Sequence, residues 1–422
     1  MGGELDSVVS QLQEKIREGG GKFEVVRHVV QSLFLKLNVR KAFGPNNICG
    51  RLMKECASQL CDVFCKIFNW SLTGCTVPEI WKRSSICPVP KKTNPSCLND
   101  YGPVALTSII MKCFERIVLK HLLRFTGQQS DPLQFAYKPN RGTDDAVLTL
   151  LHNAFMHVNQ PGSFVRILFV DFSSAFNTIQ PHLLAHKLLT LNVDPKLILW
   201  IVNFLVNRTQ SVCFHNSVSA KRSTSTGSPQ GTVLSPALFT SYTNDCRGTD
   251  ITHVIKYSDD TAIEDMSNCD DVYFKQVDQF YSWCQENYLN LNVSKTKELL
   301  IDFRKCPLPI ADLYIDGEKV ERVSEYKYLG VIVDERLDFK QNTECIFKKC
   351  QSRIYCLQKL RNIGISQEIL ENYYKSCVES LLTFSFICWF GSLTVREKNV
   401  LEGVMRVCSK VVGKRQASLE VV

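Results

Sequence analysis

The sequence predicts an α+β fold in which one β-sheet carries helices on one of its faces. Three observations lead to this class: a run of apolar and β-branched residues at 164–172 typical of a buried strand, an acidic hairpin at 254–263, and a helical pattern at 271–289 followed by a strand at 298–303. Strand, helices, hairpin, helix and strand is the element order of a sheet backed by helices.

Length and composition narrow the class of protein. The chain has 422 residues, enough for more than one compact unit, and 45% of them are hydrophobic while 22% are charged. These values exclude a disordered chain, a collagen-like chain and a disulfide miniprotein. No apolar run approaches the roughly 20 residues that span a bilayer, and the first residues lack the apolar core of a signal peptide. We therefore expect an intracellular protein without a membrane span. The nineteen cysteines include no Cys-x-x-Cys pair, so the spacing does not favour a zinc site.

The remaining elements follow from periodicity and from turn residues. Residues 1–38 predict a helix, a flexible turn at Gly19–Gly21 and a second helix. Pro and Gly recur across residues 41–107 and predict loops there, except for a helix with apolar periodicity at 52–68. Further helices are predicted at 108–125, at 143–158 with Thr143 as N-cap, and from about Ser235. Beyond Asn342 the pattern is helical to the end, with a break at 362–364 and Ser366 as the new N-cap.

The positive charge is concentrated at the C-terminal end. Lys and Arg outnumber Asp and Glu by 50 to 42 in the whole chain, and by 13 to 7 within residues 340–422. A basic helical region of this kind is expected to contact a polyanion. A solvated helical surface without a partner is an equally good interpretation of the charge alone.

Three carboxylates form the strongest candidate site. Asp171 stands at the end of the predicted buried strand, and Asp259 and Asp260 stand in the turn of the acidic hairpin. If strand and hairpin are neighbours, these acids converge on one edge of the sheet, where their mutual repulsion calls for divalent cations. Two Mg²⁺ ions shared by such carboxylates support in-line phosphoryl transfer, by activating the attacking oxygen and neutralising the leaving one.

A loop rich in Gly and Pro lies between these acids. Gly227-Ser228-Pro229-Gln230-Gly231 and the residues up to Pro236 require a particular backbone path. Glycines let a backbone approach a nucleotide closely, and an amide such as that of Gln230 can contact sugar or phosphate. An ordinary strand-to-helix loop is the alternative.

These segments resemble the successive catalytic motifs of reverse transcriptases, and more closely those of non-LTR (LINE-type, jockey-like) retrotransposons. The matching segments are 170–179 (Val-Asp-Phe-Ser-Ser-Ala-Phe-Asn-Thr-Ile), Gln230-Gly231, Tyr257–Asp260, 103–108, 131–137, 291–297 (Leu-Asn-Val-Ser-Lys-Thr-Lys) and Tyr328–Val331. They stand in the family's order, and the resemblance runs from about Lys41 to near the C-terminus.

The resemblance implies a right-hand polymerase of fingers, palm and thumb, with an antiparallel palm sheet backed by helices. The implied division is an N-terminal extension (1–38), a further extension with the fingers (39–163), a palm with an inserted fingers segment ending in the primer-grip hairpin (164–335) and a basic helical thumb (336–422). It also implies an RNA-directed DNA polymerase that uses two Mg²⁺ ions, or Mn²⁺, an RNA template, a DNA primer and deoxynucleoside triphosphates. Such an enzyme would act in the nucleus, the cytoplasm or both.

The resemblance also implies a role for each matching residue. Asp171, Asp259 and Asp260 would hold the metal ions. Lys295 would assist the departure of pyrophosphate; a solvated surface lysine is the alternative. Phe176 would lie under the sugar and disfavour a ribose 2′-OH; an ordinary core Phe is the alternative. The remaining nucleotide-binding candidates in the matching motifs are Phe172, Gln230 and Gly231, and the primer-grip candidates are Tyr328, Leu329 and Gly330. Outside those motifs, Lys91, Lys92 and Arg141 are possible contacts to the phosphates of the nucleotide.

Two departures from the family pattern leave alternatives open. No segment resembles the endonuclease domain that usually precedes this region, so the chain is expected to be a polymerase fragment or a domesticated or decaying copy. Gly102 stands where the family carries an Arg that contacts the nucleotide. A relic with weak or no catalysis that still binds RNA–DNA hybrid is therefore the second hypothesis. A group II intron-type maturase is the third, which the segments 291–297 and 328–331 disfavour.

Overall fold

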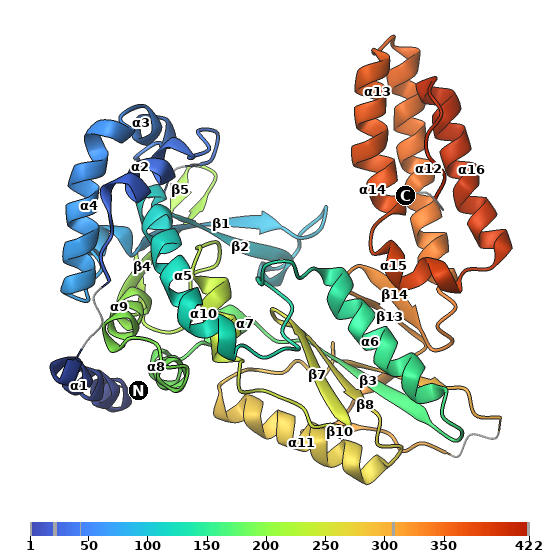
Figure 1. The fold of residues 1–422 in the computed structure, drawn as a ribbon, viewed down its shortest axis with the longest axis horizontal. Helices are drawn as coiled ribbons and strands as arrows, with labels where there is room; N and C mark the ends of the chain where they lie inside the picture. The colour runs from blue at the N-terminus through green and yellow to red at the C-terminus, as the bar shows by residue number, and fades with distance from the viewer. Residues whose placement is uncertain (1, 20–22, 43, 306–308, 420–422) are drawn as a thin grey trace. The chain divides into compact units, whose positions relative to one another are not determined.

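The computed structural model describes residues 2–19, 23–42, 44–305 and 309–419. The chain divides into two compact units. Unit 1 comprises residues 1–137, 172–246 and 282–290, and unit 2 comprises residues 138–171, 247–281 and 291–422. Figure 1 gives the element labels. Among the described residues, no helix has the length and apolar character needed to cross a membrane.

Unit 1 combines helices with a small mixed sheet. Its strands run in the order β2-β1-β4-β5, with β6 also paired to β4, and β1 is antiparallel to β2 but parallel to β4. These strands are β1 (Arg83–Pro90), β2 (Tyr101–Thr107), β4 (Arg208–Phe214), β5 (Ser217–Val218) and β6 (Arg222–Thr224). Its helices are α1 (Gly2–Gly19), α2 (Arg27–Leu35), α3 (Gly50–Glu55), α4 (Ala57–Thr73), α5 (Ile109–Gln129), α7 (Ala175–Thr178), α8 (Pro181–Thr190), α9 (Pro195–Leu205), α10 (Ser235–Tyr242) and the short turns η1 (Glu79–Trp81) and η2 (Leu98–Asp100).

Aromatic side chains form the core between three helices of unit 1. Phe68 of α4 stacks on Phe114 of α5 with ring centroids 4.3 Å apart, and Phe114 meets Trp200 of α9 edge-on at 5.0 Å. All three side chains are fully buried. The indole N–H of Trp200 donates to the hydroxyl of Ser71 over 2.9 Å, so the one polar atom of this cluster is satisfied.

Unit 2 is built on a five-stranded sheet of order β12-β9-β3-β8-β7, antiparallel except for the β12–β9 pair. The strands are β3 (Phe164–Val170), β7 (Thr252–Tyr257), β8 (Asp260–Asp265), β9 (Lys297–Asp302) and β12 (Glu321–Val323). Two hairpins, β10 (Tyr314–Ile315) with β11 (Glu318–Lys319) and β13 (Glu325–Tyr328) with β14 (Val331–Asp334), complete the strands.

Helices cover both faces of this sheet, so the prediction of helices on one face is wrong. Asn153 of α6 (Thr143–Val158) donates to Glu264, which is paired across the ladder with Ile167. The neighbouring Arg166 points to the other face, because side chains alternate along a strand, and there it contacts Tyr273 of α11 (Asp270–Glu286). Coverage on both sides explains why every residue of β3 is buried.

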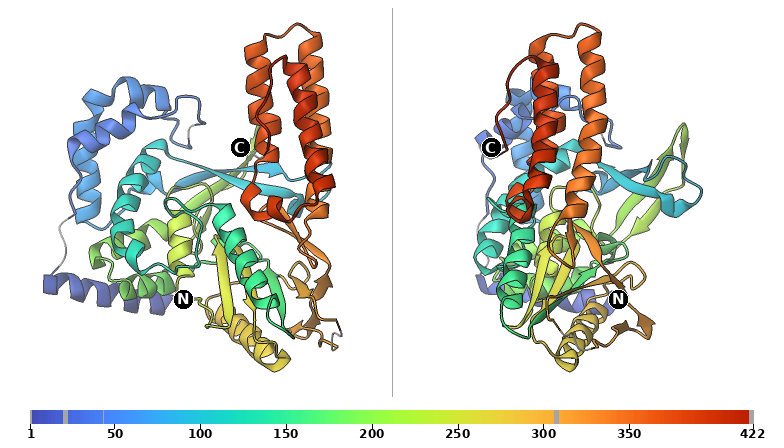
Figure 2. Two further views of the ribbon diagram at one scale, coloured as in Figure 1. Left: turned by 45° about the vertical axis from the view of Figure 1, so that its right-hand side comes forward. Right: turned by 90° about the vertical axis from the view of Figure 1, so that its right-hand side faces the viewer.

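The C-terminal part of unit 2 is helical. Its elements are α12 (Lys340–Asn362), α13 (Gln367–Tyr374), the π-turn η3 (Lys375–Glu379), α14 (Ser380–Leu382), α15 (Phe386–Trp389), η4 (Phe390–Ser392) and α16 (Val395–Val412). The helices α12, α13 and α16, orange to red, lie side by side in every view (Figures 1 and 2). The hydroxyl of Ser385 donates to Asp144 at the start of α6 over 2.6 Å, which ties the base of these helices to the sheet region.

Several sequence-based boundaries are confirmed and three need correction. The helices at 108–125, 271–289 and from Ser235, the acidic hairpin and the break at 362–364 are all present. The N-cap of α6 is Gly142 rather than Thr143, because Asp145 accepts the amide of Gly142 at 2.6 Å. The helix at 52–68 is divided at Cys56, which leaves helical geometry while the apolar spacing continues. The C-terminal helices break again at Ser385, which adopts a left-handed conformation. The predicted turn at Gly19–Gly21 lies largely outside the described residues.

Candidate active site

The three predicted acids lie at one end of the unit 2 sheet. Strands β3 and β8 are antiparallel, and their last pair at this end is Val170 with Thr261. The next residues in that register are Asp171 and Asp260, and residues facing each other in this way have Cβ atoms about 5 Å apart. The sequence therefore places two carboxylates on adjacent strand ends.

The third acid sits in the hairpin turn. Strands β7 and β8 close with the pair Tyr257–Asp260, which leaves Ser258 and Asp259 as a two-residue turn. The prediction that Asp260 also stands in the turn is wrong, because Asp260 pairs with Tyr257 as the first residue of β8. Ser258 has a φ of 63°, as the tight turns of such hairpins require. The turn holds Asp259 exposed beside Asp260.

The carboxylates of this group influence one another. The pKa of Asp260 is raised above its ordinary value, first because its carboxyl is partly withdrawn from water and then because of the negative charges of Asp259 and Asp171. The pKa of the Tyr326 phenol is also raised, by burial and then by Asp260 and Asp171. The charges of Asp259 and Asp171 thus disfavour the ionised state of Asp260, an effect that a bound cation would offset.

The donor set suits a hard divalent cation. Carboxylate oxygens are the ligands that Mg²⁺ prefers, and Asp171 and Asp259 both keep solvent access. Within the part of the chain that the structure describes, no three His, Cys, Asp or Glu side chains are already arranged around a single ion position. The metal-ligand roles of Asp171, Asp259 and Asp260 therefore stay predictions, supported by residue chemistry and mutual repulsion.

The segment Leu291–Lys297 holds Asp171 from both sides. The amide of Asn292 donates to the carbonyl of Asp171 over 2.8 Å, and the amide of Asp171 donates to the hydroxyl of Thr296 over 3.4 Å. Thr296 is fully buried and its hydroxyl donates in turn to the carbonyl of Asn292. Lys295 lies between them with its Nζ 3.8 Å from Oδ2 of Asp171, so the predicted lysine does reach the acid group.

The hairpin of the predicted primer grip lies against the same sheet. Leu329 and Gly330 form its two-residue turn with φ values of 47° and 97°. Tyr328 is buried, with its ring 5.2 Å from that of Phe169 in β3, so this side chain supports the hairpin from within. A Cβ on Gly330 would lie 2.8 Å from Cε1 of Phe384, which is closer than van der Waals contact allows.

Sequence reasoning missed Tyr326, two residues before Tyr328. Its ring stacks on Phe169 with centroids 4.1 Å apart and an interplanar angle of 10°. The charges of Asp260 and Asp171 contribute to the raised pKa of its phenol. The alternation of strand β13 could have indicated it, because Tyr326 and Tyr328 share one face of the strand.

The loop carrying Gln230 has a defined path within unit 1. The amide of Gly227 donates to the carbonyl of Ile179 and that of Ser228 to the carbonyl of Phe176, both over 2.7 Å. Gly227 has a φ of 71° and lies so close to Asn177 that a Cβ would be only 2.6 Å from its carbonyl oxygen. The structure thus joins this loop to the segment of Phe176, whose half-buried ring lies 4.9 Å from Phe239.

The β1–β2 hairpin of unit 1 carries the two predicted lysines. Lys92 forms an ion pair of 2.9 Å with Asp100, whose pKa is lowered by that lysine and by the amides of Ser96 and Cys97. Lys91 instead extends along Gly102, with its Cε 3.5 Å from where a Cβ on that glycine would stand. Gly231 approaches the same strand, because a Cβ there would lie 3.2 Å from the carbonyl oxygen of Ala105.

The predicted site residues divide between the two units. Unit 2 contains Asp171, Asp259, Asp260, Lys295, the hairpin Tyr328–Gly330 and Arg141. Unit 1 contains Phe172, Phe176, Gln230, Gly231, Lys91 and Lys92.

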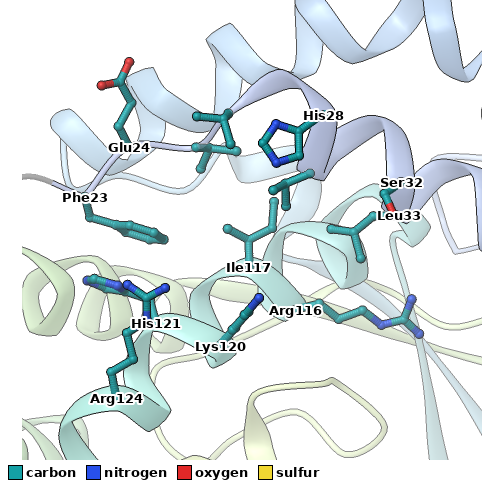
Figure 3. A pocket seen from close by; sticks show the side chains of 13 residues that line it. Phe23, Glu24, His28, Ser32, Leu33, Arg116, Ile117, Lys120, His121 and Arg124 are labelled. Carbon is teal, nitrogen blue, oxygen red and sulfur yellow. The ribbon is translucent and has the colours of Figure 1, made fainter.

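Unit 1 also contains a cavity of about 500 Å³ that involves none of these residues. It lies between α5 and the segment 23–33, and its lining includes Arg116, Lys120 and Arg124. At one end the ring of Phe23 stacks on His121 with centroids 3.8 Å apart (Figure 3). Glu24 is the only acid in the lining, so the donor set of the cavity does not match that of a divalent metal site.

A sheet end that carries one strand-end aspartate and an acidic hairpin turn, with a lysine beside them, is an arrangement suited to metal-assisted nucleotidyl transfer. A family model described as "Reverse transcriptase (RNA-dependent DNA polymerase)" matches residues 89–333, which is more than half of the chain. The chain belongs to the reverse transcriptase family. A short second match, to the N-terminal region of alkylated DNA repair protein alkB homolog 8, covers only residues 339–380.

Named relatives agree with the family. The chain is 24% identical over 405 residues to a probable RNA-directed DNA polymerase from transposon BS of Drosophila melanogaster, an alignment that covers 91% of this chain and 44% of that protein. It is 26% identical over 373 residues to the RNA-directed DNA polymerase from mobile element jockey of the same species, covering 84% and 40%. The predicted resemblance to jockey-like reverse transcriptases is thus confirmed. The chain spans less than half the length of these curated relatives.

Proposed function

We propose that this chain is an RNA-directed DNA polymerase of a non-LTR retrotransposon, which extends a DNA primer on an RNA template. The observation that carries the proposal is the pairing of β3 with β8, which ends at Val170–Thr261, directly next to Asp171 on one chain segment and Asp260 on the other, with Asp259 in the adjoining turn. The family match favours this function over a catalytically inactive relic.

Each residue of the acid group has a distinct task in this proposal. Bound Mg²⁺ would supply the Lewis acid that activates the primer 3′-hydroxyl and neutralises the leaving pyrophosphate. Asp171 and Asp259 would hold the ions and Asp260 would complete the set. Lys295 would donate a proton to the departing pyrophosphate, since it is exposed and only 3.8 Å from Asp171.

The nucleotide site would use residues of unit 1. Phe176 would close the space below the sugar, Gln230 and Gly231 would contact the nucleotide through an amide and a close backbone approach, and Lys91 would meet the triphosphate. Lys92 and Phe172 of unit 1 are retained as further candidates, and so is Arg141, which belongs to unit 2. To bind a phosphate, Lys92 would have to break its ion pair with Asp100.

We assign the right-hand division as predicted: extension and fingers within 1–163, palm within 164–335 and thumb within 336–422. The turn at Leu329 and Gly330 would meet the primer terminus. Exposed cations of α12 such as Lys348, Lys349 and Arg353 would follow the template–primer backbone. We place the reaction in the nucleus or cytoplasm, where the RNA template and deoxynucleotides occur.

A primer-extension assay tests the proposal. The full chain is mixed with a labelled DNA primer on an RNA template, deoxynucleotides and Mg²⁺, and with the Asp259→Asn variant as control. Extension by the wild type but not by the variant supports the proposal. Absence of extension by the wild type in Mg²⁺ and in Mn²⁺, with the template–primer bound, overturns it.

A further inference from the structure

A buried acid outside the catalytic group contacts the Gln230 loop. Glu115 lies on α5, its side chain is fully buried, and its Oε2 accepts two backbone hydrogen bonds. The donors are the amide of Val233 at 2.6 Å and the amide of Leu234 at 3.0 Å. These residues immediately follow Gln230-Gly231-Thr232, so the Glu115 carboxylate of α5 binds the end of the loop.

The two amides need such an acceptor. Val233 and Leu234 lead into α10, which begins at Ser235, so their amides need an acceptor outside that helix. Side chains inside the loop satisfy other groups: the hydroxyl of Ser235 donates to the carbonyl of Pro229 over 2.7 Å. Glu115, from a distant part of the sequence, supplies the acceptor for the two amides that lead into α10.

The loop is now fixed at both ends. Its first residues are bound to the carbonyls of Phe176 and Ile179, and its last residues are bound to Glu115. Gln230 and Gly231 stand between these anchors and remain accessible, half-buried and exposed respectively. A displacement of Val233 would therefore be transmitted to the accessible residues.

Burying the carboxylate of Glu115 costs free energy, so Glu115 is not there only to fill space in the core. Transfer of a charge from water into a protein interior is unfavourable unless hydrogen bonds and opposite charges offset it. Lys112 and Arg116 on the same helix offset part of the cost, but Oε1 finds no hydrogen-bond partner among the residues that the structure describes. An apolar side chain would fill the same space without the penalty, but it could not accept the two amides.

We propose that Glu115 is a positioning residue, which sets the location of Gln230 and Gly231 for the incoming nucleotide by holding the amides of Val233 and Leu234. This inference rests on the nucleotide-contacting role proposed for Gln230. Glu115 itself does not touch the substrate.

Two variants and one matched control test the inference by kinetics. Glu115→Gln keeps the shape and one acceptor oxygen but removes the charge, and Glu115→Ala removes both acceptors. We expect the KM for deoxynucleotides to rise about fivefold in Glu115→Gln and further in Glu115→Ala, while kcat changes by less than about twofold. The control is Glu264→Gln, because Glu264 is equally buried but bonds to Asn153 and His253 in unit 2. Its KM should equal that of the wild type.

Hydrogen exchange provides a readout that does not need polymerase activity. In the free protein, the amides of Val233 and Leu234 should exchange at least about tenfold faster in Glu115→Gln than in the wild type, and no faster in Glu264→Gln. Unchanged exchange overturns the inference, and so does faster exchange with an unaltered KM. If the wild type extends no primer at all, the proposed function fails, whereas the exchange result still shows whether Glu115 holds the loop.

Discussion

The Nζ of Lys295 lies 3.8 Å from Oδ2 of Asp171, and the segment that carries this lysine also bonds the amide and the carbonyl of Asp171. One stretch of seven residues therefore fixes the backbone of the strand-end acid and brings a cation to its side chain. Both side chains keep solvent access, so the ion pair itself adds little stability. In the proposed mechanism, acid and lysine would act on the same phosphate.

Substitution of the acids tests their role. Asp171→Asn or Asp259→Asn removes one charge from a site proposed to hold two divalent ions, so primer extension should fall at least about a hundredfold, which corresponds to about 2.7 kcal/mol in the barrier. Template–primer binding, measured by fluorescence anisotropy, should remain within about twofold, because the basic residues elsewhere provide it. Extension that survives the double substitution would disprove the assignment.

Phe176 is proposed to exclude the ribose 2′-OH. Phe176→Val opens space below the sugar, so ribonucleotide incorporation should increase relative to deoxynucleotide incorporation by about tenfold, as measured with each nucleotide in separate single-turnover reactions. Phe239→Leu serves as the control, because it alters the ring that packs on Phe176 without shortening Phe176 itself. Equal discrimination in wild type and Phe176→Val would make Phe176 an ordinary core residue.

The cations of α12 are proposed to contact the nucleic-acid backbone. Lys348, Lys349 and Arg353 are exposed, and joint replacement by Gln should weaken template–primer binding and make its salt dependence shallower by up to about three counterions. The control replaces Lys375 and Lys414, which are already engaged by Glu371 at 3.1 and 2.9 Å. A slope of log K against log salt that stays the same in the α12 variant would favour the solvated-surface interpretation.

The buried Glu115 should make stability depend on pH. Burial raises its pKa to about 7, although the amides of Leu234 and Val233 and the charges of Lys112 and Arg116 lower it. Because the folded pKa exceeds the unfolded one, the contribution to stability is fully present below about pH 4.5 and is lost as the pH rises to about 7. Urea unfolding at pH 5 and pH 8 should show the wild type losing about 2 kcal/mol more than Glu115→Gln between these values. Equal losses would mean that Glu115 does not change protonation in this range.

The sequence predicts those parts of the site that are local in the chain. Strand β3 is apolar except for Arg166, and the hairpin of Asp259 has a short polar turn between two strands with apolar centres, so the strand ends that carry the predicted acids are located correctly. Motif resemblance supplies Lys295, and the structure shows how its segment is held beside the acid: the amide of Asn292 donates to the carbonyl of Asp171, and the amide of Asp171 donates to the hydroxyl of Thr296.

Long-range relationships could not be predicted in the same way. Strands β1 and β2 are missed because Pro88, Pro90 and Pro103 suggest loops. The structure accommodates these prolines because β1 pairs with β4 only over Arg83–Ile86 and β2 is an edge strand. The role of Glu115 could not be predicted from the local sequence either, because its hydrogen-bond partners Val233 and Leu234 stand more than a hundred residues further along the chain.

Gly102 is the position where the sequence leaves its family's pattern. It lies in β2 opposite Val89, and a Cβ there would meet only Cε of Lys91 at 3.5 Å, the carbonyl oxygen of Val89 at 3.8 Å and Cγ of Lys91 at 3.9 Å, which are ordinary contacts. The structure thus accepts a side chain at this site, provided that Lys91 keeps its extended course.

Gly102→Arg should therefore raise polymerase activity. An arginine could stack on the incoming base and donate charge-assisted hydrogen bonds to the triphosphate, contacts that glycine cannot make. A preorganised donor of this kind contributes about 2–4 kcal/mol to transition-state stabilisation, so kcat/KM for deoxynucleotides should increase tenfold or more in steady-state extension. The competing possibility is that Lys91, which extends along Gly102, already supplies the missing charge. The Lys91→Met variant separates the two possibilities. If Lys91 compensates, Lys91→Met loses activity and the added Gly102→Arg substitution restores it. If Gly102→Arg leaves the kinetics unchanged both with Lys91 and with Met at position 91, position 102 has no part in nucleotide binding.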